Sequence, residues 1–271
     1  MKWLKKKDKE ILNIALPAIV ANITVPMLGL VDVAITGHLG NAAYIAAIAV
    51  GSMLFTVISW VCGFLRMGTS GMTAQAYGRG DSAETMLLLM RGLCVALAVA
   101  LAVLVLQRPL LVLAISVMGV EPSLQPLVRT YFQICVWGAP AMLCLYAFTG
   151  WFIGLQNTRI TMTVSIVQNI VNIVASLTLV YGMGMKIDGV ATGPLIAQWG
   201  GLLVAASYAC LKHRGLLRSL SFRAVTRGEA LMRFFNVNRD IFLRTLFLVA
   251  VNLFFVSAGA TQGTVVLAVN T

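Results

Sequence analysis

The 271-residue chain is 59% hydrophobic and only 11% charged, whereas about 25% of the residues in a soluble domain are charged. This composition excludes a water-soluble globular protein, because soluble helices need a polar face, and it predicts an all-α, polytopic membrane protein. The formal net charge of +11 does not indicate nucleic-acid binding, since the basic residues lie between apolar stretches, where they set membrane topology.

The first apolar stretch, residues 11–36, contains a single carboxylate, Asp32, and the nearest Lys or Arg is Lys9. The stretch is long enough to cross a bilayer as a helix, which takes about 20 residues. An unpaired Asp at mid-membrane costs about 2.5–3.5 kcal/mol. We therefore predict that Asp32 faces a bundle interior or a water-filled cavity, where it titrates or binds a cation. The alternative is an aspartate near the helix end, in the headgroup layer.

Seven membrane helices are expected. The first, 10–36, contains Pro17 and Pro26, and an internal proline removes a backbone hydrogen bond and bends a helix. The others are expected at 44–69, 86–106, 127–153, 161–181, 190–211 and 241–258. Segment 107–126 carries three prolines and a short interfacial apolar run. The final run, VVLAVNT, is too short to span a membrane.

This pattern divides the chain into a six-helix lobe at 1–211, a basic connector at 212–239 and the start of a second lobe at 240–271. Counted on alternate sides of the helices, 17 of the 20 Lys and Arg residues fall on one side. Basic residues concentrate in the cytoplasm, so the N-terminus and the connector are expected there. The connector is either a basic amphipathic helix on an anionic leaflet or a solvated loop.

Polar and aromatic side chains within the expected helices are further candidates for function. Asn169 and Asn172 share one helix face, and their amides can hydrogen-bond a carboxyl group or coordinate a cation; the alternative is hydrogen bonding between helices. Tyr131, Trp137 and Tyr146 can stack against an organic cation, with packing or interfacial anchoring as the alternative.

The sequence predicts neither an enzyme nor a metal or cofactor site. It contains no phosphate-binding Gly-rich loop with a lysine and no G-x-S-x-G or H-E-x-x-H motif. The five cysteines all lie in apolar runs, without a C-x-x-C spacing, which is typical of packing residues.

Several motifs, taken in order, resemble the multidrug and toxic compound extrusion (MATE) family, and within it the DinF branch of bacterial inner-membrane transporters. They are LVDVAITGHLG in the first helix, GTSGMTAQAYGRGD at the end of the second, the turn GLQNTRITM, and QNIVN in the fifth. The resemblance extends over essentially the whole chain. It implies twelve helices in two six-helix lobes, with cation-driven antiport of organic compounds through a cavity between them.

The resemblance also implies roles for individual residues. Asp32 matches the acidic position used in proton coupling, Pro17 matches the proline at which the first helix bends, and Asn172 matches a polar position of helix five. Where many relatives place a second acid, this chain has Ser176, so Asp32 is expected to work with neutral partners. Asn169, Asn172 and Ser176 are the expected polar partners in the cavity.

The leading hypothesis is a multi-pass exporter of the bacterial inner membrane that exchanges small cationic or amphipathic organic compounds for H⁺, with Na⁺ as the alternative coupling ion. A complete path is expected to need a second lobe or a homodimer, because only the first lobe and the seventh helix are matched. Two alternatives stay open. A lipid-linked saccharide flippase would need a strongly cationic cavity, and a truncated, non-transporting membrane fragment would act by interaction.

Overall fold

The computed structural model describes residues 19, 31, 34–37, 42–215, 225 and 228–261, with the backbone alone considered at 230, 249–250 and 252–261. Its elements are α2 (Ala42–Cys62), α3 (Phe64–Gly78), α4 (Ser82–Val105), α5 (Gln107–Val117), α6 (Gln125–Cys135), η1 (Val136–Gly138), α7 (Ala139–Gly154), α8 (Thr158–Leu177), η2 (Thr178–Gly182), α9 (Ile187–Lys212) and α12 (Gly228–Thr261). Within the described residues every element is a helix, which confirms the all-α prediction.

Five helical segments are long and apolar enough to cross a membrane, which confirms the multi-pass prediction for the described part of the chain. They are Ala42–Gly78, Ser82–Val105, Gln125–Gly154, Thr158–Gly182 and Ile187–Lys212. Most of the expected first helix and the final run VVLAVNT lie outside the described residues.

The connection expected between the second and third helices is much shorter than predicted. The gap left between the expected helices 44–69 and 86–106 is largely helical, because α3 continues to Gly78 and α4 already begins at Ser82. The carboxylate of Asp81 accepts a hydrogen bond from the backbone N–H of Glu84 at 2.9 Å, which caps α4. Gly80 has φ +71°, a conformation that favours glycine and closes the turn.

Two other expected segments also differ from the structure. In residues 107–126, where a short interfacial apolar run was expected, the structure has the helix α5. The single helix expected at 127–153 is divided into α6 and α7 by the 3-10 turn η1. Pro140 follows directly in the first turn of α7, where its missing N–H costs no helical hydrogen bond.

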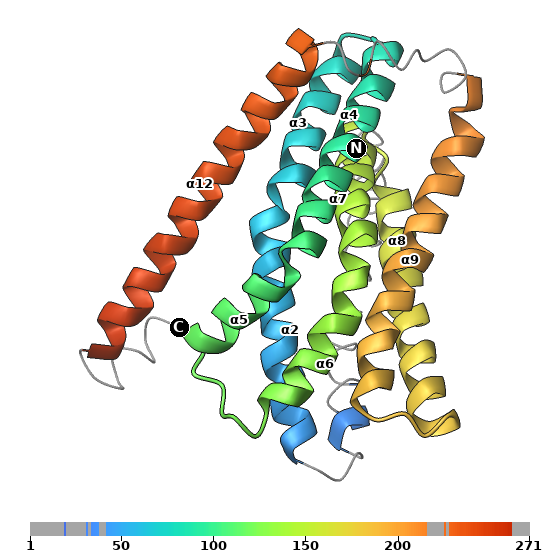
Figure 1. Ribbon diagram of the computed structural model, residues 1–271. Coiled ribbons are helices and arrows are strands. Elements are labelled where there is room, and N and C mark those ends of the chain that lie inside the picture. Colours follow the sequence, from blue (N-terminus) through green and yellow to red (C-terminus); the bar gives the residue numbers. More distant parts are fainter. Residues whose placement is uncertain are drawn as a thin grey trace, which may run out of the picture.

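Helix α7 is the centre of the bundle. It packs against α3, α4, α8 and α9, and most of its residues are buried. Its close approach to α3 depends on glycine, because a Cβ atom at Gly150 would lie 2.5 Å from the backbone oxygen of Arg66. Figure 1 shows α8 and α9 side by side, and this pair packs along its length.

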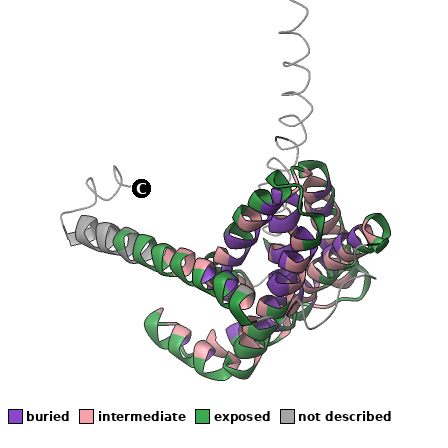
Figure 2. Cartoon of the chain, turned by 90° about the horizontal axis from the view of Figure 1, so that it is seen from above, coloured by how far each residue is buried: buried purple, intermediate pink, exposed green. Residues whose placement is uncertain are grey.

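Helix α12 begins well before the expected seventh helix, at Gly228 instead of residue 241, so part of the expected connector is helical. Near its start it packs on α3: Phe234 is fully buried in the core, and Asn238 lies against Gly68. Farther along, Leu243, Leu246 and Phe247 are exposed. Figures 1 and 2 show the helix leaving the bundle in this direction.

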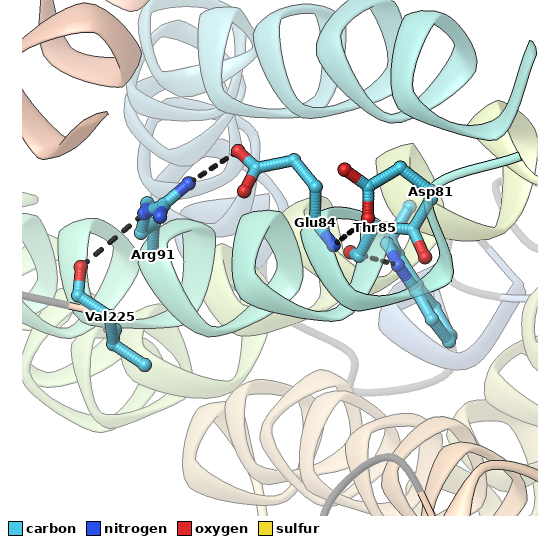
Figure 3. A network of polar contacts seen from close by, with 6 residues as sticks. Asp81, Glu84, Thr85, Arg91 and Val225 are labelled. Carbon is cyan, nitrogen blue, oxygen red and sulfur yellow. Dashed lines mark hydrogen bonds and ion pairs between the residues drawn. The ribbon is translucent and has the colours of Figure 1, made fainter. Parts of the chain in front are cut away.

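A buried arginine ties α4 to the segment before α12. Arg91 is only 2% exposed; its guanidinium forms an ion pair with Glu84 at 2.7 Å and donates a hydrogen bond to the backbone oxygen of Val225 at 3.3 Å. Figure 3 shows this network beside the start of α4, where the indole N–H of Trp151 also bonds the oxygen of Thr85 at 2.8 Å. A buried charge is tolerated when it is paired and hydrogen-bonded, and Arg91 meets both conditions.

Candidate functional site

Asp32, the expected ion-coupling carboxylate, and Pro17, the expected hinge of the first helix, both lie outside the described residues. Their expected roles therefore stay predictions. Among the described residues of that stretch, Val31 and Ile35 pack against Val180 of η2 and Val190 of α9. Along α8 and η2, Val180 lies about one turn after Ser176 and about two turns after Asn172.

Helix α8 carries two of the expected cavity partners as a buried pair. Asn172 is 6% exposed and Ser176 is fully buried. The Ser176 hydroxyl donates to Oδ1 of Asn172 at 3.2 Å, as residues four apart on a helix can. Gly193 of α9 leaves room for this pair, since a Cβ atom there would come within 3.0 Å of Asn172 Oδ1 and even closer to the Ser176 hydroxyl. Asn169, the third expected partner, is half-buried one turn earlier.

A further polar contact joins α8 to α9. The side-chain amide of Gln168 on α8 donates to Oε1 of Gln198 on α9 at 3.3 Å. Gly201 makes this approach possible, because a Cβ atom there would clash with the Gln168 side chain. Such amide pairs are common between membrane helices, but Gln198 also lines a cavity.

That cavity, of about 200 Å³, opens between α2, α6, α7 and α9. Its lining is Ser52, Phe55, Thr56, Ser59, Tyr131, Cys135, Gly138, Ala139, Met142, Pro194, Leu195 and Gln198. No side chain in this lining carries a formal charge, and the polar ones are hydroxyl, thiol and amide groups. The cavity therefore offers apolar contacts with a few hydrogen-bonding groups, the usual make-up of a small-molecule site.

The three aromatic residues expected to contact substrate are placed differently. Tyr131 is in the cavity lining and 6% exposed. Tyr146 is outside the lining, but its hydroxyl hydrogen-bonds Ser59, which is in the lining. Trp137 is 58% exposed and lies outside the cavity, with its backbone oxygen accepting from the indole of Trp199 at 3.1 Å. The structure therefore brings Tyr131 and Tyr146, but not Trp137, to this cavity.

Sequence reasoning missed the cavity residues of α2. Ser52, Thr56 and Ser59 recur at helical spacing in an otherwise apolar helix, so all three can share one face. This polar stripe was present in the sequence and would have indicated a side of α2 turned toward a polar space.

The backbone of α8 and α9 is irregular close to this site. Pro194 lies inside α9, where a proline removes one helical hydrogen bond. Helix α8 ends in the π-helical turn η2, a form that is frequent at functional sites. Among the described residues no group of His, Cys, Asp and Glu could hold a metal ion.

Comparison with known families decides the family of the chain. The model of the MatE family matches residues 17–178, more than half of the chain. The chain belongs to the MatE family. This membership confirms the expected resemblance and the prediction that the chain is not an enzyme.

Two curated relatives support the MatE assignment. The DNA damage-inducible protein F of Escherichia coli is 35% identical over all of this chain and 59% of its own length. A probable multidrug resistance protein NorM of Shewanella oneidensis is 31% identical over 77% of this chain and 46% of its own. This MatE chain therefore spans about half the length of the relatives that it matches.

Solved structures confirm the fold. A crystal structure of MATE in the bent conformation matches with a TM-score of 0.80 and 20% identity, over 97% of this chain and 58% of that one. A superfamily transporter from Pyrococcus furiosus, described as having a binding pocket of reversed polarity, matches with a TM-score of 0.76 and 19% identity, over 96% and 57% of the two chains. The MatE chain therefore has the fold of the corresponding part of these transporters.

Proposed function

We propose that this chain forms the first lobe of a secondary-active exporter of small organic compounds. The observation that carries the proposal is the uncharged cavity between α2, α6, α7 and α9, in a chain of the MatE family. The relative from Shewanella oneidensis is named a probable multidrug resistance protein. An apolar cavity with scattered hydroxyl and amide groups suits lipophilic compounds of varied shape, because few fixed polar contacts must be satisfied.

Coupling is assigned to Asp32, with H⁺ as the ion and Na⁺ as the alternative. Protonation neutralises a carboxylate and lowers its cost of burial, so the protonated and ionised forms favour different packings of the first helix, with Pro17 as the hinge. A two-state change needs such a difference in stability between its states. Asn172 and Ser176, which lie one to two turns before Val180, against which Ile35 packs, are uncharged, and this supports a coupling site in which the partners of Asp32 are neutral.

The remaining expectations follow from this proposal. The chain is placed in the bacterial inner membrane with its N-terminus in the cytoplasm, and a second lobe or a second copy completes the path. The flippase alternative is disfavoured, because the cavity lining contains no Lys or Arg to hold a pyrophosphate.

The test is efflux of a lipophilic cation, driven by a proton gradient, from cells that express this chain or its Asp32→Asn variant. We expect efflux from the wild-type chain and loss of coupled efflux in Asp32→Asn, with equal amounts of protein in the membrane. Asp188→Asn is the matched control, because Asp188 is an exposed carboxylate at the start of α9, away from the cavity.

Each outcome has a definite meaning. Wild-type efflux from Asp32→Asn would refute Asp32 as the coupling carboxylate. If neither protein exports although both reach the membrane, these residues alone do not form a working path, and the test is repeated with a second lobe supplied in the same cell.

A further inference from the structure

A second and larger cavity lies at the end of the bundle where α7 and α9 finish and α8 begins. It measures about 680 Å³ and is lined by Tyr77, Leu155, Gln156, Asn157, Thr158, Arg159, Ile160, Thr163, Tyr208, Lys212 and His213. It shares no residue with the uncharged cavity of the candidate site. Because three membrane-spanning segments end here, this cleft lies at the boundary between hydrocarbon and water.

The charges in the cleft have one sign. Arg159 and Lys212 are both in the lining, and the lining contains no Asp or Glu. Among the residues that the structure describes, neither cation forms an ion pair. The third ionisable base, His213, has its pKa lowered by burial and by the charge of Lys212, so its charged form is disfavoured. The cleft therefore carries two positive charges that the described residues do not neutralise.

The two side chains that hydrogen-bond the Tyr208 hydroxyl group are both donors. Its hydroxyl oxygen accepts from the side-chain amide of Asn157 at 2.8 Å and from the ammonium group of Lys212 at 2.9 Å. The ammonium group has three N–H bonds, so at least one more is available to a ligand. An anion with several oxygens would accept from Lys212 and Arg159 together, and such charge-assisted bonds are short and strong.

Part of the lining is apolar, and aromatic contacts hold Tyr208 and His213 in place. Leu155 and Ile160 contribute hydrocarbon surface. The ring of Tyr208 packs edge-on against Phe152 at 5.6 Å, and His213 packs in the same way against Trp151 at 5.1 Å. A ligand that places an anionic group at Lys212 and Arg159 can therefore lay an apolar part against the same cleft.

We propose that this cleft binds the phosphate group of an anionic phospholipid, with Arg159 and Lys212 holding the phosphate and Leu155 and Ile160 contacting the start of an acyl chain. The same phosphate chemistry exists in soluble phosphate, but the position of the cleft at the membrane boundary favours the lipid. The site does not depend on the proposed transport function.

The test uses the purified full chain in phosphatidylcholine nanodiscs, with and without phosphatidylglycerol that carries a nitroxide spin label. Bound and free lipid are separated by their electron paramagnetic resonance spectra. We expect a specifically immobilised fraction in the wild-type chain. In the variant carrying both Arg159→Gln and Lys212→Gln the affinity should fall by about thirtyfold, since each of the two lining cations contributes roughly fivefold to the affinity for an anionic lipid.

Controls separate charge at this cleft from charge nearby. Arg214→Gln removes an exposed basic residue two positions away that is not in the lining, and it should leave binding unchanged. Lys212→Arg keeps the charge and should retain binding, and unfolding by heat identifies any variant that fails to fold. Equal lipid immobilisation in the double variant would overturn the proposal. Displacement of the lipid by inorganic phosphate alone would assign the cleft to a soluble anion and also overturn it.

Discussion

Gly193 of α9 lies directly against the side chain of Ser176 on α8. No side chain larger than hydrogen fits at this position without moving the Ser176 hydroxyl, which is fully buried and bonded to Asn172. The polar pair of α8 and the glycine of α9 therefore form one unit. The space around residue 176 also restricts which side chain fits there. It holds the hydroxyl group of a serine, whereas a carboxylate is larger, carries a charge and would be buried away from solvent.

Gly193→Ala should destabilise the protein. The added methyl group forces Ser176 to rotate away from Asn172 or the helices to separate, and overpacking of this kind costs about 1–3 kcal/mol. The measurement is thermal unfolding in detergent. Gly200→Ala on the same helix is the control, because its methyl group would lie 3.7 Å from Val171, an ordinary contact. Ser176→Ala combined with Gly193→Ala should recover part of the loss, and the absence of recovery would contradict the steric explanation.

Arg91→Met should destabilise the bundle and loosen the segment before α12. It leaves the carboxylate of Glu84, which is 30% exposed, without its partner and the oxygen of Val225 without a donor. A buried acceptor that loses its hydrogen bond costs about 1–3 kcal/mol. The melting temperature should fall, and the rate of proteolysis between α9 and α12 should rise. Arg239→Met removes an exposed pair with Asp240 and should change stability by at most about 1 kcal/mol.

Tyr131→Leu should weaken binding of a lipophilic cation to the purified protein. Tyr131 lines the uncharged cavity, and loss of a cation–π contact of about 0.5–2 kcal/mol corresponds to a loss of roughly two- to thirtyfold in affinity. Trp137→Leu is the matched control, since Trp137 lies outside this cavity. The measurement is the equilibrium affinity of each variant, determined by fluorescence anisotropy of the ligand. If Trp137→Leu had the larger effect, the compound would bind on another face.

Stability should fall as the pH falls below the ordinary pKa of histidine, about 6.5. Burial, and then the charge of Lys212, lower the pKa of His213 in the folded protein. Between the folded and unfolded pKa values the unfolded chain binds the extra proton, so acid favours unfolding there. His213→Gln should reduce this dependence of the melting temperature on pH. An unchanged pH profile in His213→Gln would contradict the expectation.

The sequence predicted the parts of the fold that depend on long apolar runs. Residues 161–181 and 190–211 were expected to be helical and lie in helical segments, because the apolar length of a spanning helix is set by the bilayer. The helix ends at the turn 79–81 were placed less well, since polarity suggested a loop although Asp81 caps α4 there. At this turn the Asp81 cap and the helix propensity of the flanking residues determine where the helices end, although the sequence there is polar.

The candidate site was predictable only in part. Asn172 could be chosen because an amide in an apolar helix is conspicuous, but its contact with Ser176 at Gly193 depends on how α8 and α9 pair. The burial of Arg91 could not be foreseen, since its second partner, Val225, lies 134 residues later in the chain. Asp32 stays the strongest prediction from sequence and lies outside the described residues.

Helix α12 is held against the bundle near its first residues, so a rotation there displaces its far end. It is fixed at one end, where Phe234 is buried, Asn238 lies against Gly68 and Phe242 packs edge-on against Phe64, and it leaves the bundle beyond that point. From Phe242 to its end at Thr261 a helix extends about 28 Å, so a rotation of only about 10° at the fixed end moves the far end by about 5 Å. A small rearrangement around Gly68 would thus be amplified over the thickness of a membrane, without any bending of α12 itself.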